Sequence, residues 1–360
     1  MKIIRWGILG TGRIAQAFAQ DLCQLPNNEL MAVGAESLQD ARQFAAEFSS
    51  PHAYGSYDEL VADPEIDIIY IVTPVVFHKE HIFLCLKAGK PVLVEKPFSM
   101  TAIEARQITA YARSQNLFCM EAMWMRFIPA MQKAIELLKS DAIGDIYMIS
   151  ASLGFYNAFD PQHQLFDPAL GGGAILDMGI YPLSLIYQLL GEPSAVSSQA
   201  HIGASGVDEQ TAVLLGFPDG QIASLSAGIR GNGRNDAFIM GTRGTMHIHT
   251  PLYRPTVLTI SQYKPSTTKS AQNSSFITRI RENPLAHKLY QQSQKIVRRI
   301  RGNQQIKVSC DGHGYGYEAA EAARCLQEGL RESPVMPLDE TIAIMMIMDT
   351  IRNPNKDSSL

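Results

Sequence analysis

The sequence predicts an α/β protein of two domains, a doubly wound parallel sheet followed by an α+β domain with a largely antiparallel, open sheet. Three observations predict this fold class. Residues 1–122 alternate short apolar runs with helical patterns, a glycine-rich turn follows the first apolar run, and from residue 123 turn residues separate the apolar runs. A chain of 360 residues is long enough for two domains, which we place at 1–122 and 123–360.

The first domain is expected to alternate strands with helices. Its strand candidates are continuous apolar runs, which are typical of parallel strands buried on both faces, and its helix candidates show apolar residues at helical spacing. The strands are expected at 3–9, 30–35, 66–72, 92–94 and 117–121, and the helices at 14–25, 38–48, 78–88 and 102–114. Strands separated by helices form a sheet covered on both faces.

In the second domain, turn sequences such as Pro218-Asp219-Gly220 and Thr242-Arg243-Gly244 separate the apolar runs. Strands joined by such turns favour an antiparallel or mixed sheet. We expect strands within 146–155 and 194–260, helices at 174–190 and 315–330 over one face, and a last helix at about 339–352 that packs back onto a domain. The other face would be free of helices, and since a second subunit commonly covers such a face, we expect a homodimer.

Composition and charge exclude several classes of protein. Hydrophobic residues make up 46% and charged residues 18% of the chain, and the net charge is −4, so we expect neither a disordered chain nor a nucleic-acid-binding protein. The longest apolar runs, such as 66–76, fall short of a membrane span. The apolar N-terminus lacks a small-residue cleavage site and leads directly into the glycine turn, so we interpret it as a strand.

The cysteines and histidines show neither a metal-binding nor a disulfide pattern. The cysteines are scattered without a C-x-x-C pair, which fits buried thiols in a reducing cytoplasm. The histidines, His163, His201 and His247 among them, have no ligand spacing, so no metal is expected. The five cysteines are Cys23, Cys85, Cys119, Cys310 and Cys325.

Residues 251–310 are strongly basic. They hold eleven Lys and Arg residues against one acid, Glu282, so their net charge of +10 leaves −14 for the rest of the −4 chain. Leu285, Leu289, Ile296 and Ile300 recur at about helical spacing between the basic residues, which predicts a basic amphipathic helix. A solvated face is the favoured interpretation, and docking of 262–307 on an anionic partner or a membrane surface is the alternative.

The run Gly10-Thr11-Gly12-Arg13-Ile14-Ala15 is a G-x-G-x-x-A turn between the first strand and the first helix. The first glycine permits the tight turn, the second lets backbone approach a pyrophosphate, and the small Ala15 permits close packing of the helix on the sheet. The helix N-terminus offers free N–H groups and partial positive charge to phosphates. A dinucleotide site is therefore expected here.

The choice between NAD and NADP depends on Glu36 and Arg42. Glu36 follows the second strand, where a carboxylate can accept hydrogen bonds from ribose hydroxyls and would repel the extra phosphate of NADP. Arg42 lies six residues further on and could reach that phosphate. The two signals conflict, and Glu36 favours NAD.

The run Val92-Leu93-Val94-Glu95-Lys96-Pro97 places a glutamate and a lysine at the carboxyl end of a strand. Ligands of open α/β sheets bind outside these strand ends. A lysine there can hydrogen-bond a substrate hydroxyl and stabilise developing negative charge. The alternative for such a pair is a surface ion pair, which this position in the fold disfavours.

At this point the sequence resembles the Gfo/Idh/MocA oxidoreductases over most of its length, the basic stretch excepted. The motifs that carry the likeness are the glycine turn, Thr73-Pro74 followed by His78, Glu95-Lys96-Pro97, and Gly171 to Pro182. Residues 121–127, together with Tyr181 four residues after Asp177, resemble the subgroup of dimeric dihydrodiol dehydrogenases and NADP-dependent D-xylose dehydrogenases.

The resemblance implies an NAD(P)-dependent dehydrogenase of a neutral sugar, polyol or vicinal diol. It places Thr73, Pro74, His78 and Glu95 near the cofactor, with His78 expected to cap its helix. Two departures are present: Val75 stands where many members have Asn, and Ala35-Glu36 stands where NADP-using relatives carry Ser-Arg. The second departure opposes the NADP preference of the subgroup.

Lys96, Tyr181 and Asp177 are the candidate catalytic residues. Asp177 and Tyr181 are i and i+4, so we expect them on one face of a helix that three glycines introduce, where backbone can pass close to a ligand. A nearby ammonium is expected to lower the pKa of the phenol. Whether Lys96 or Tyr181 is the formal base stays open, and a core tyrosine that bonds Asp177 is the alternative.

The substrate pocket is expected to include Trp124, Phe155 and Tyr156, although such aromatics often belong to a plain core. Arg126 is a further pocket candidate, but an internal ion pair is favoured for it because the expected substrates are neutral. The alternative to an enzyme is a non-catalytic, dinucleotide-binding sensor of the same fold. The presence of Lys96, Asp177 and Tyr181 together favours the enzyme.

Overall fold

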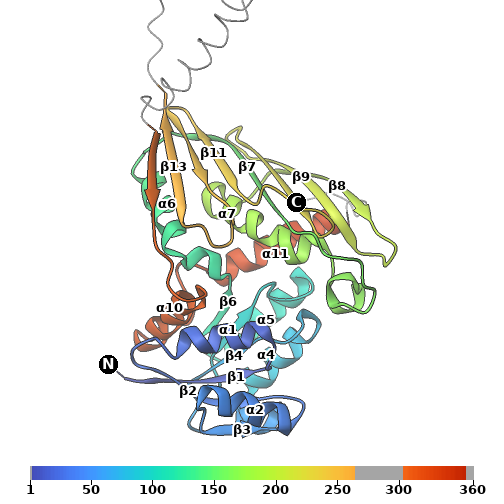
Figure 1. The fold of residues 1–360 in the computed structure, drawn as a ribbon, viewed down its shortest axis with the longest axis vertical. Helices are drawn as coiled ribbons and strands as arrows, with labels where there is room; N and C mark the ends of the chain where they lie inside the picture. The colour runs from blue at the N-terminus through green and yellow to red at the C-terminus, as the bar shows by residue number, and fades with distance from the viewer. Residues whose placement is uncertain (1, 264–302, 354–360) are drawn as a thin grey trace, which may run out of the picture.

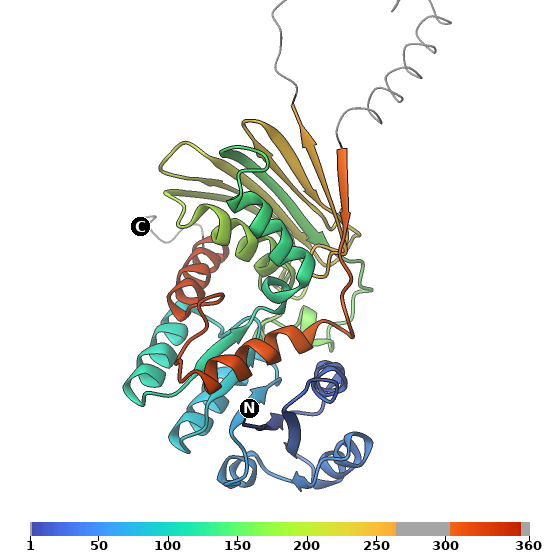
Figure 2. The same ribbon diagram turned by 90° about the vertical axis from the view of Figure 1, so that its left-hand side faces the viewer.

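The computed structural model describes residues 2–263 and 303–353, which form two domains, each built on one sheet (Figure 1). The expected basic amphipathic helix, and most of the stretch 262–307, lie outside the described residues. Figure 2 shows the second sheet stacked beyond the first domain, with helices between the two. The fold class predicted from the sequence is confirmed.

The first sheet has six strands, all parallel. Their order is β3 (His52–Tyr54), β2 (Asn28–Gly34), β1 (Ile4–Leu9), β4 (Ile68–Ile71), β5 (Val92–Glu95) and β6 (Cys119–Ala122). The chain order reverses between β1 and β4, which creates the crevice where doubly wound sheets bind ligands. The five strands that the sequence predicts are present, and β3 was missed because its three residues are too few to show a pattern.

The helices of the first domain lie on both faces of this sheet (Figure 1). They are α1 (Arg13–Leu22), α2 (Leu38–Phe48), α3 (Tyr57–Ala62), α4 (His78–Lys87) and α5 (Ala102–Ser114), with a single 3-10 turn, η1 (Val75–Phe77), before α4. Ser37, Ser56 and Thr101 cap α2, α3 and α5, since each side chain accepts a backbone N–H in the first turn. α1 buries Phe18, whose ring stacks on that of Tyr70 in β4 at 3.7 Å.

The second sheet has eight strands, and only the β7–β10 pairing is parallel. In spatial order they are β14 (Asn303–Lys307), β13 (Val257–Gln262), β12 (Gly244–Ile248), β11 (Ala237–Gly241), β7 (Ile146–Gly154), β10 (Ile222–Gly228), β9 (Asp208–Gly216) and β8 (Ala195–Ile202). Buried and open positions alternate along β9, β10 and β11, as expected for a sheet with one covered face.

The helices near this sheet include one that the sequence analysis missed, α6 (Pro129–Lys139), and α7 (Ile180–Leu190). The turn before α7 is a π-helix, η5 (Ile175–Gly179), so the expected helix 174–190 is not regular. Short 3-10 turns complete this part of the chain: η2 (Trp124–Phe127), η3 (Gln164–Phe166) and η4 (Pro168–Leu170).

The placement expected for helix 315–330 is wrong. α10 (Tyr315–Gln327) packs against α1 of the first domain, not on the second sheet. The carboxylate of Asp21 in α1 accepts the backbone N–H groups of His313, Gly314 and Gly316 at 2.8–3.2 Å and so anchors the N-terminus of α10. The last helix, α11 (Leu338–Arg352), packs against both α5 and α7.

Two further expectations need correction. Residues 168–190 are long and apolar enough to cross a membrane by length and composition, but 67% of that window is buried inside the protein, as in the core helix of a globular domain. All five cysteines are free, yet Cys23 is exposed and Cys310 is half-buried, so the expectation of buried thiols holds for Cys85, Cys119 and Cys325.

Candidate active site

The glycine turn has the geometry that a dinucleotide phosphate needs. Gly10 adopts φ +111°, a conformation that favours glycine, and a Cβ there would lie 3.2 Å from the carbonyl oxygen of Val72. A Cβ on Gly12 would meet nothing within 4 Å, so this side of the turn is open to a ligand. Gly12 begins α1 without a side-chain cap, and Arg13 and Ile14 are exposed beside it. These features fit a bound pyrophosphate at the helix N-terminus.

Glu36 and Arg42 are both exposed. Glu36 lies two residues after the end of β2, whereas Arg42 lies on α2. Two apolar side chains, Leu38 at the start of α2 and Phe77 at the end of η1, are 40% and 39% exposed. Because β1 and β2 are parallel, Glu36 and the glycine turn both follow the carboxyl ends of these neighbouring strands.

The expectation that His78 caps its helix is wrong. Its buried ring lies between two backbone oxygens, with Nδ1 3.0 Å from Pro97 O and Nε2 2.8 Å from Thr73 O. Burial lowers the pKa of His78 to about 4, although both carbonyl groups oppose this shift. His78 therefore ties the Thr73-Pro74 turn after β4 to the loop after β5.

Lys96, Asp177 and Tyr181 meet at the carboxyl end of β5. The Lys96 ammonium Nζ lies 2.7 Å from Asp177 Oδ1 and 3.1 Å from Asp177 O, and 4.9 Å from the centre of the Tyr181 ring. Asp177 lies in the π-helical turn, and π-turns of this kind are frequent at functional sites. Asp177 and Tyr181 thus flank the ammonium from two sides.

The charge on Lys96 is stabilised by its neighbours. Burial alone would lower the pKa of this amine, but the carboxylate of Asp177, with a smaller contribution from Glu95, raises it above its ordinary value. Lys96 is therefore an ammonium at neutral pH, able to donate a proton or a hydrogen bond.

The expected lowering of the Tyr181 pKa is wrong in sign. The tyrosine is only 7% exposed, and burial raises its pKa to about 12; Lys96 acts in the expected direction but is outweighed. The hydroxyl oxygen accepts a hydrogen bond of 2.9 Å from Trp124 Nε1, so within the described residues its partner is Trp124 rather than Asp177. Tyr181 is a neutral phenol whose own proton stays available for donation.

Glu95 lies behind Lys96 and points into the protein. Its two oxygens accept hydrogen bonds from the Tyr70 hydroxyl and from the backbone N–H of Lys96. Burial raises the pKa of Glu95 to about 7. Glu95 therefore shapes the Lys96 loop from inside, through hydrogen bonds to groups of the protein itself.

The three glycines before the π-turn pack against the protein itself. A Cβ on Gly171 would lie 2.4 Å from Val75 Cγ1, on Gly172 2.6 Å from Leu165 O, and on Gly173 2.2 Å from Asp208 Oδ1. Asp208 also accepts the backbone N–H of Ile175 at 2.9 Å. The glycines therefore let this loop fit closely against its neighbours in the protein.

Aromatic side chains form one wall beside Tyr181. The ring of Trp124 stacks on that of Tyr315, with 4.8 Å between the ring centres. The ring centre of Tyr253 lies 5.5 Å from that of Trp124 and 6.0 Å from that of Phe155. Tyr253 and Tyr315 were missed because no local motif marks them. Tyr156, which the sequence analysis assigned to the pocket, is 63% exposed and has no ring contact with this wall in the described part of the chain.

Arg126 lies in the interior, not in the pocket. Its side chain is inaccessible, and its guanidinium donates to Glu340 Oε2 at 2.6 Å and to Ser184 Oγ at 2.9 Å. The internal ion pair that its motif favoured is what the structure holds. The nearby Glu121, also buried, accepts hydrogen bonds from Phe98 N and Thr341 Oγ1, which joins the loop after β5 to α11.

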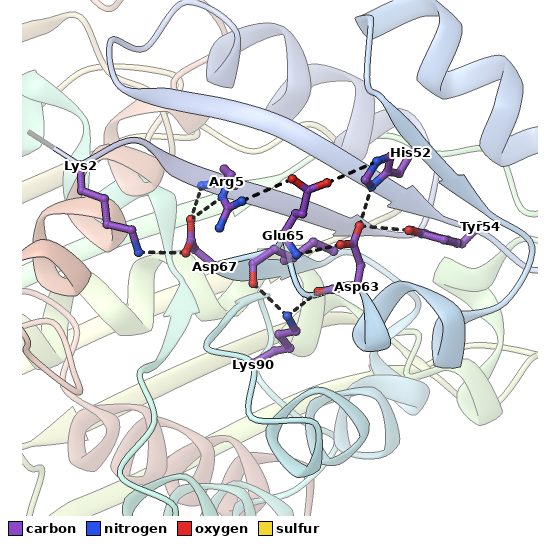
Figure 3. Close-up of polar contacts among 9 residues, drawn as sticks. Lys2, Arg5, His52, Tyr54, Asp63, Glu65, Asp67 and Lys90 are labelled. Carbon is purple, nitrogen blue, oxygen red and sulfur yellow. Dashed lines mark hydrogen bonds and ion pairs between the residues drawn. The ribbon is translucent and has the colours of Figure 1, made fainter.

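One cluster of metal-ligating residue types lies near the amino ends of strands of the first sheet, away from the carboxyl end of β5 (Figure 3). Ligand atoms of His52, Asp63 and Glu65 lie within 4.8 Å of one another. His52 Nδ1 is 2.7 Å from Asp63 Oδ2, and Arg5 Nη1 is 3.7 Å from Glu65 Oε1, so cationic and donor side chains of the chain itself already occupy these carboxylates. We interpret the cluster as an ion-pair network.

Two family models match the chain. Residues 4–123 match the model described as an oxidoreductase family with an NAD-binding Rossmann fold, and residues 131–247 match the GFO/IDH/MocA C-terminal domain. The first match covers the whole first sheet with the glycine turn and Lys96, and the second covers β7 to β11 and most of β12 in the second sheet.

Curated relatives are similar over almost the whole chain. The trans-1,2-dihydrobenzene-1,2-diol dehydrogenase of Mus musculus is 36% identical over 353 residues, covering 97% of this chain and 96% of the relative. The Homo sapiens protein of that name is 34% identical over 357 residues, with the same coverage.

Solved structures share the fold. The aldose–aldose oxidoreductase from Caulobacter crescentus, complexed with glycerol, superposes with a TM-score of 0.81 at 20% identity and covers 98% of this chain and 97% of its own. A 3-ketoreductase from Actinomadura kijaniata, in complex with NADP and TDP-benzene, gives 0.77 at 22% identity and covers 97% of each chain.

Proposed function

Because the chain belongs to the GFO/IDH/MocA oxidoreductase family, we propose that it transfers a hydride between a hydroxyl-bearing carbon of a sugar, polyol or vicinal diol and nicotinamide C4. The observation that carries the proposal is the meeting of Lys96, Asp177 and Tyr181 at the strand ends beside the glycine turn. When bound, the nicotinamide supplies the hydride chemistry, and the protein supplies position and charge.

In this proposal the protein's residues handle the proton. Lys96, held as an ammonium by Asp177, hydrogen-bonds the substrate oxygen and stabilises the negative charge that develops there. Tyr181 exchanges a proton with the same oxygen, and Trp124 fixes the phenol by donating to it. In the direction of carbonyl reduction, the Lys96 ammonium and the Tyr181 phenol each already carry a proton that can be given to the substrate oxygen. In the direction of alcohol oxidation one of them must first release its own.

The proposed substrates are neutral because, within residues 2–263 and 303–353, both cationic candidates for the pocket are already paired with carboxylates. The guanidinium of Arg126 is committed to Glu340, and the ammonium of Lys96 to Asp177. The aromatic wall of Trp124 and Tyr253 suits the apolar face of a ring-shaped diol or sugar. The relatives named for trans-dihydrobenzene diol agree with this substrate class.

For the cofactor we propose NAD in preference to NADP, on the exposed carboxylate of Glu36. We further propose a homodimer, formed through the helix-free face of the second sheet. The five free cysteines fit a reducing compartment, and we propose the cytoplasm.

The test is turnover with a defined panel. The protein is incubated with NAD or NADP and with D-xylose, D-glucose, inositol or a cyclic trans-diol, and reduced-nicotinamide absorbance is followed over time. We expect turnover with at least one pair, and a fall in kcat of about a hundredfold or more for both Lys96→Met and Tyr181→Phe, the range for losing one acid–base group.

Both variants are also measured for cofactor binding by quenching of Trp fluorescence. Retained binding with lost turnover places the defect in the chemical step. Full turnover by both variants would contradict the assigned roles. Tight cofactor binding without turnover on any substrate would instead support a dinucleotide sensor.

A further inference from the structure

We propose that Tyr315, at the start of α10, is a positioning residue for Tyr181 and that it acts through Trp124. Its ring holds the Trp124 indole in the orientation in which Nε1 donates to the Tyr181 hydroxyl. The kinetic part of this inference rests on the proposed function, whereas the orientation of Trp124 does not.

Trp124 connects α10 to Tyr181. The residue is 5% exposed, and the one polar atom of its side chain, Nε1, donates to the Tyr181 hydroxyl at 2.9 Å. The ring of Tyr315 stacks on the indole, with 4.8 Å between the ring centres and 27° between the ring planes. Stacked aromatic rings attract each other beyond the area that they bury, so the stack opposes any rotation that would carry Nε1 away from Tyr181.

The backbone beside Tyr315 closes on the indole from a second side. Gly314 has φ +104°, a conformation that favours glycine, and a Cβ there would lie 3.1 Å from Trp124 Cζ3 and 2.7 Å from Ile128 Cδ1. Cζ3 belongs to the six-membered ring and lies on the side of the indole away from Nε1. Gly314 and Tyr315 thus contact an edge and a face of the indole, and Nε1 is left to point toward Tyr181.

The start of α10 is itself held in place by α1. Asp21 Oδ2 accepts the backbone N–H groups of Gly314 and Gly316 at 2.8 and 3.2 Å. Gly312 has φ +54°, and a Cβ there would collide with Asp21 Oδ1, so the three alternate glycines let this turn close around the carboxylate. Because α1 begins at the glycine turn, the helix expected to bind the cofactor phosphates also fixes the position of Tyr315.

Loss of the stack should disturb the phenol and leave the ammonium in place. The orientation of the Tyr181 hydroxyl depends on the bond from Trp124, whereas Lys96 is held separately by Asp177. A reacting group displaced by about 1 Å can lose about a hundredfold in rate. We therefore expect a change at Tyr315 to slow the chemical step through Tyr181.

Tryptophan fluorescence, excited where tyrosine does not absorb, tests the orientation without any activity. The chain has two tryptophans, and Trp6 is fully buried in β1, so a difference between variants at position 315 reports Trp124. In Tyr315→Leu we expect the emission to shift to longer wavelength and acrylamide to quench it more, because the indole loses its stack. Tyr315→Phe keeps a ring and should keep the wild-type emission. Wild-type emission and quenching in Tyr315→Leu would overturn the proposal.

Tyr317→Leu is the matched control on the same helix. The Tyr317 hydroxyl accepts the backbone N–H of Asp311, and its ring makes no ring contact with Trp124 in the described part of the chain. The control should therefore keep the wild-type emission. Thermal unfolding checks that each variant folds, and a Trp124 emission that shifts as much in Tyr317→Leu as in Tyr315→Leu would contradict a specific effect of Tyr315.

A double-mutant cycle in kcat tests the positioning role. Tyr315→Leu should lower kcat about tenfold or more and change KM less than about threefold, and Tyr315→Phe should restore most of the loss. In a Trp124→Phe background, which lacks Nε1, the same Tyr315→Leu change should cost less than about twofold, because the link to Tyr181 is already broken. An equal loss in both backgrounds would overturn the role. If no substrate of the panel is turned over, the proposed function fails, and the emission of Trp124 still decides whether Tyr315 orients it.

Discussion

Glu36 is the residue on which we expect the choice of cofactor to depend. Its exposed carboxylate stands at the end of β2, where it can bond ribose hydroxyls but repels a 2′-phosphate. Glu36→Ser removes that repulsion and leaves Arg42 in place. We expect the ratio of kcat/KM with NADP to kcat/KM with NAD to rise at least about tenfold, equivalent to about 1.4 kcal/mol.

The control for this change is Arg42→Ala in the Glu36→Ser background. It should reverse most of the gain with NADP and leave the kinetics with NAD unchanged, because the guanidinium contacts only the added phosphate in this scheme. A ratio that does not change in Glu36→Ser would show that cofactor choice depends on other residues. Initial rates at fixed substrate and varied cofactor give the measurement.

At the scale of single residues, the sequence predicted which residues meet at the site better than it predicted their protonation states. Lys96, Asp177 and Tyr181 each belong to a recognisable motif, and the structure brings them together. The pKa of Tyr181 was predicted with the wrong sign because burial decides it, and the burying groups, such as Trp124, lie far away in the chain.

At the scale of elements, the polar network in Figure 3 holds the amino ends of four strands together. Asp67 accepts from Lys2 and Arg5 beside β1, and Asp63 accepts from His52 in β3. Lys90, just before β5, donates to the backbone oxygens of Asp63 and Ile66. The network stabilises the end of the first sheet where these strands begin, which is the end opposite the candidate active site.

Asp63 makes the stability of this edge dependent on pH. Burial alone would raise its pKa, but donors from His52, the Glu65 amide and Tyr54 lower it overall. A carboxyl whose folded pKa is lowered contributes stability above its unfolded pKa, and the contribution is lost as the pH falls through the folded pKa. Asp63→Asn should therefore reduce the free energy of unfolding at neutral pH by about 2–3 kcal/mol.

The difference between Asp63→Asn and the wild type should shrink as the pH falls through the acid range, and denaturant unfolding at several pH values measures it. Asp58→Asn, which changes an exposed carboxyl on the nearby α3, is the control and should be close to neutral. A constant difference at all pH values would show that Asp63 contributes through packing and not through its charge.

Most elements of the first domain could be predicted because their patterns are local. α2 and α5 have the predicted bounds, since Ser37 and Thr101 mark where each begins. The failures have physical causes: β3 is too short to show a period, and the π-turn at Asp177 depends on contacts with Asp208. The position of α10 depends on Asp21, almost 300 residues earlier in the chain.

At the scale of the whole molecule, the chain returns to its first domain after building the second sheet. Asp349 of α11 accepts the backbone N–H of Ala102 at the start of α5, and Arg113 of α5 pairs with Asp339. On the other side of α11, Ser198 of β8 donates to Ile351 O. The last helix thus contacts both sheet systems, which fixes the aromatic wall and the π-turn relative to the glycine turn.

The helix-free face of the second sheet is the remaining large surface without a covering element in the described part of the chain (Figure 2). Its side chains are mostly small or weakly polar, and shallow depressions lined by Ser152, Gln199 and Ser226 run across it. Leu214 projects from this face at 51% exposure between Ser197 and Ser224 of the adjoining strands. Such a surface, lined mostly by small and uncharged side chains, suits a second copy of itself.

Leu214→Arg tests the proposed dimer. At a two-fold interface the variant places an unpaired guanidinium from each subunit in a desolvated surface, so we expect the dissociation constant to rise about a hundredfold or more. Light scattering after size exclusion should give a dimer mass for the wild type and a monomer mass for the variant, with thermal unfolding little changed. Ile103→Arg, on an exposed apolar residue of α5, is the control and should stay dimeric. A monomeric wild type, or a dimeric Leu214→Arg, would exclude this face as the interface.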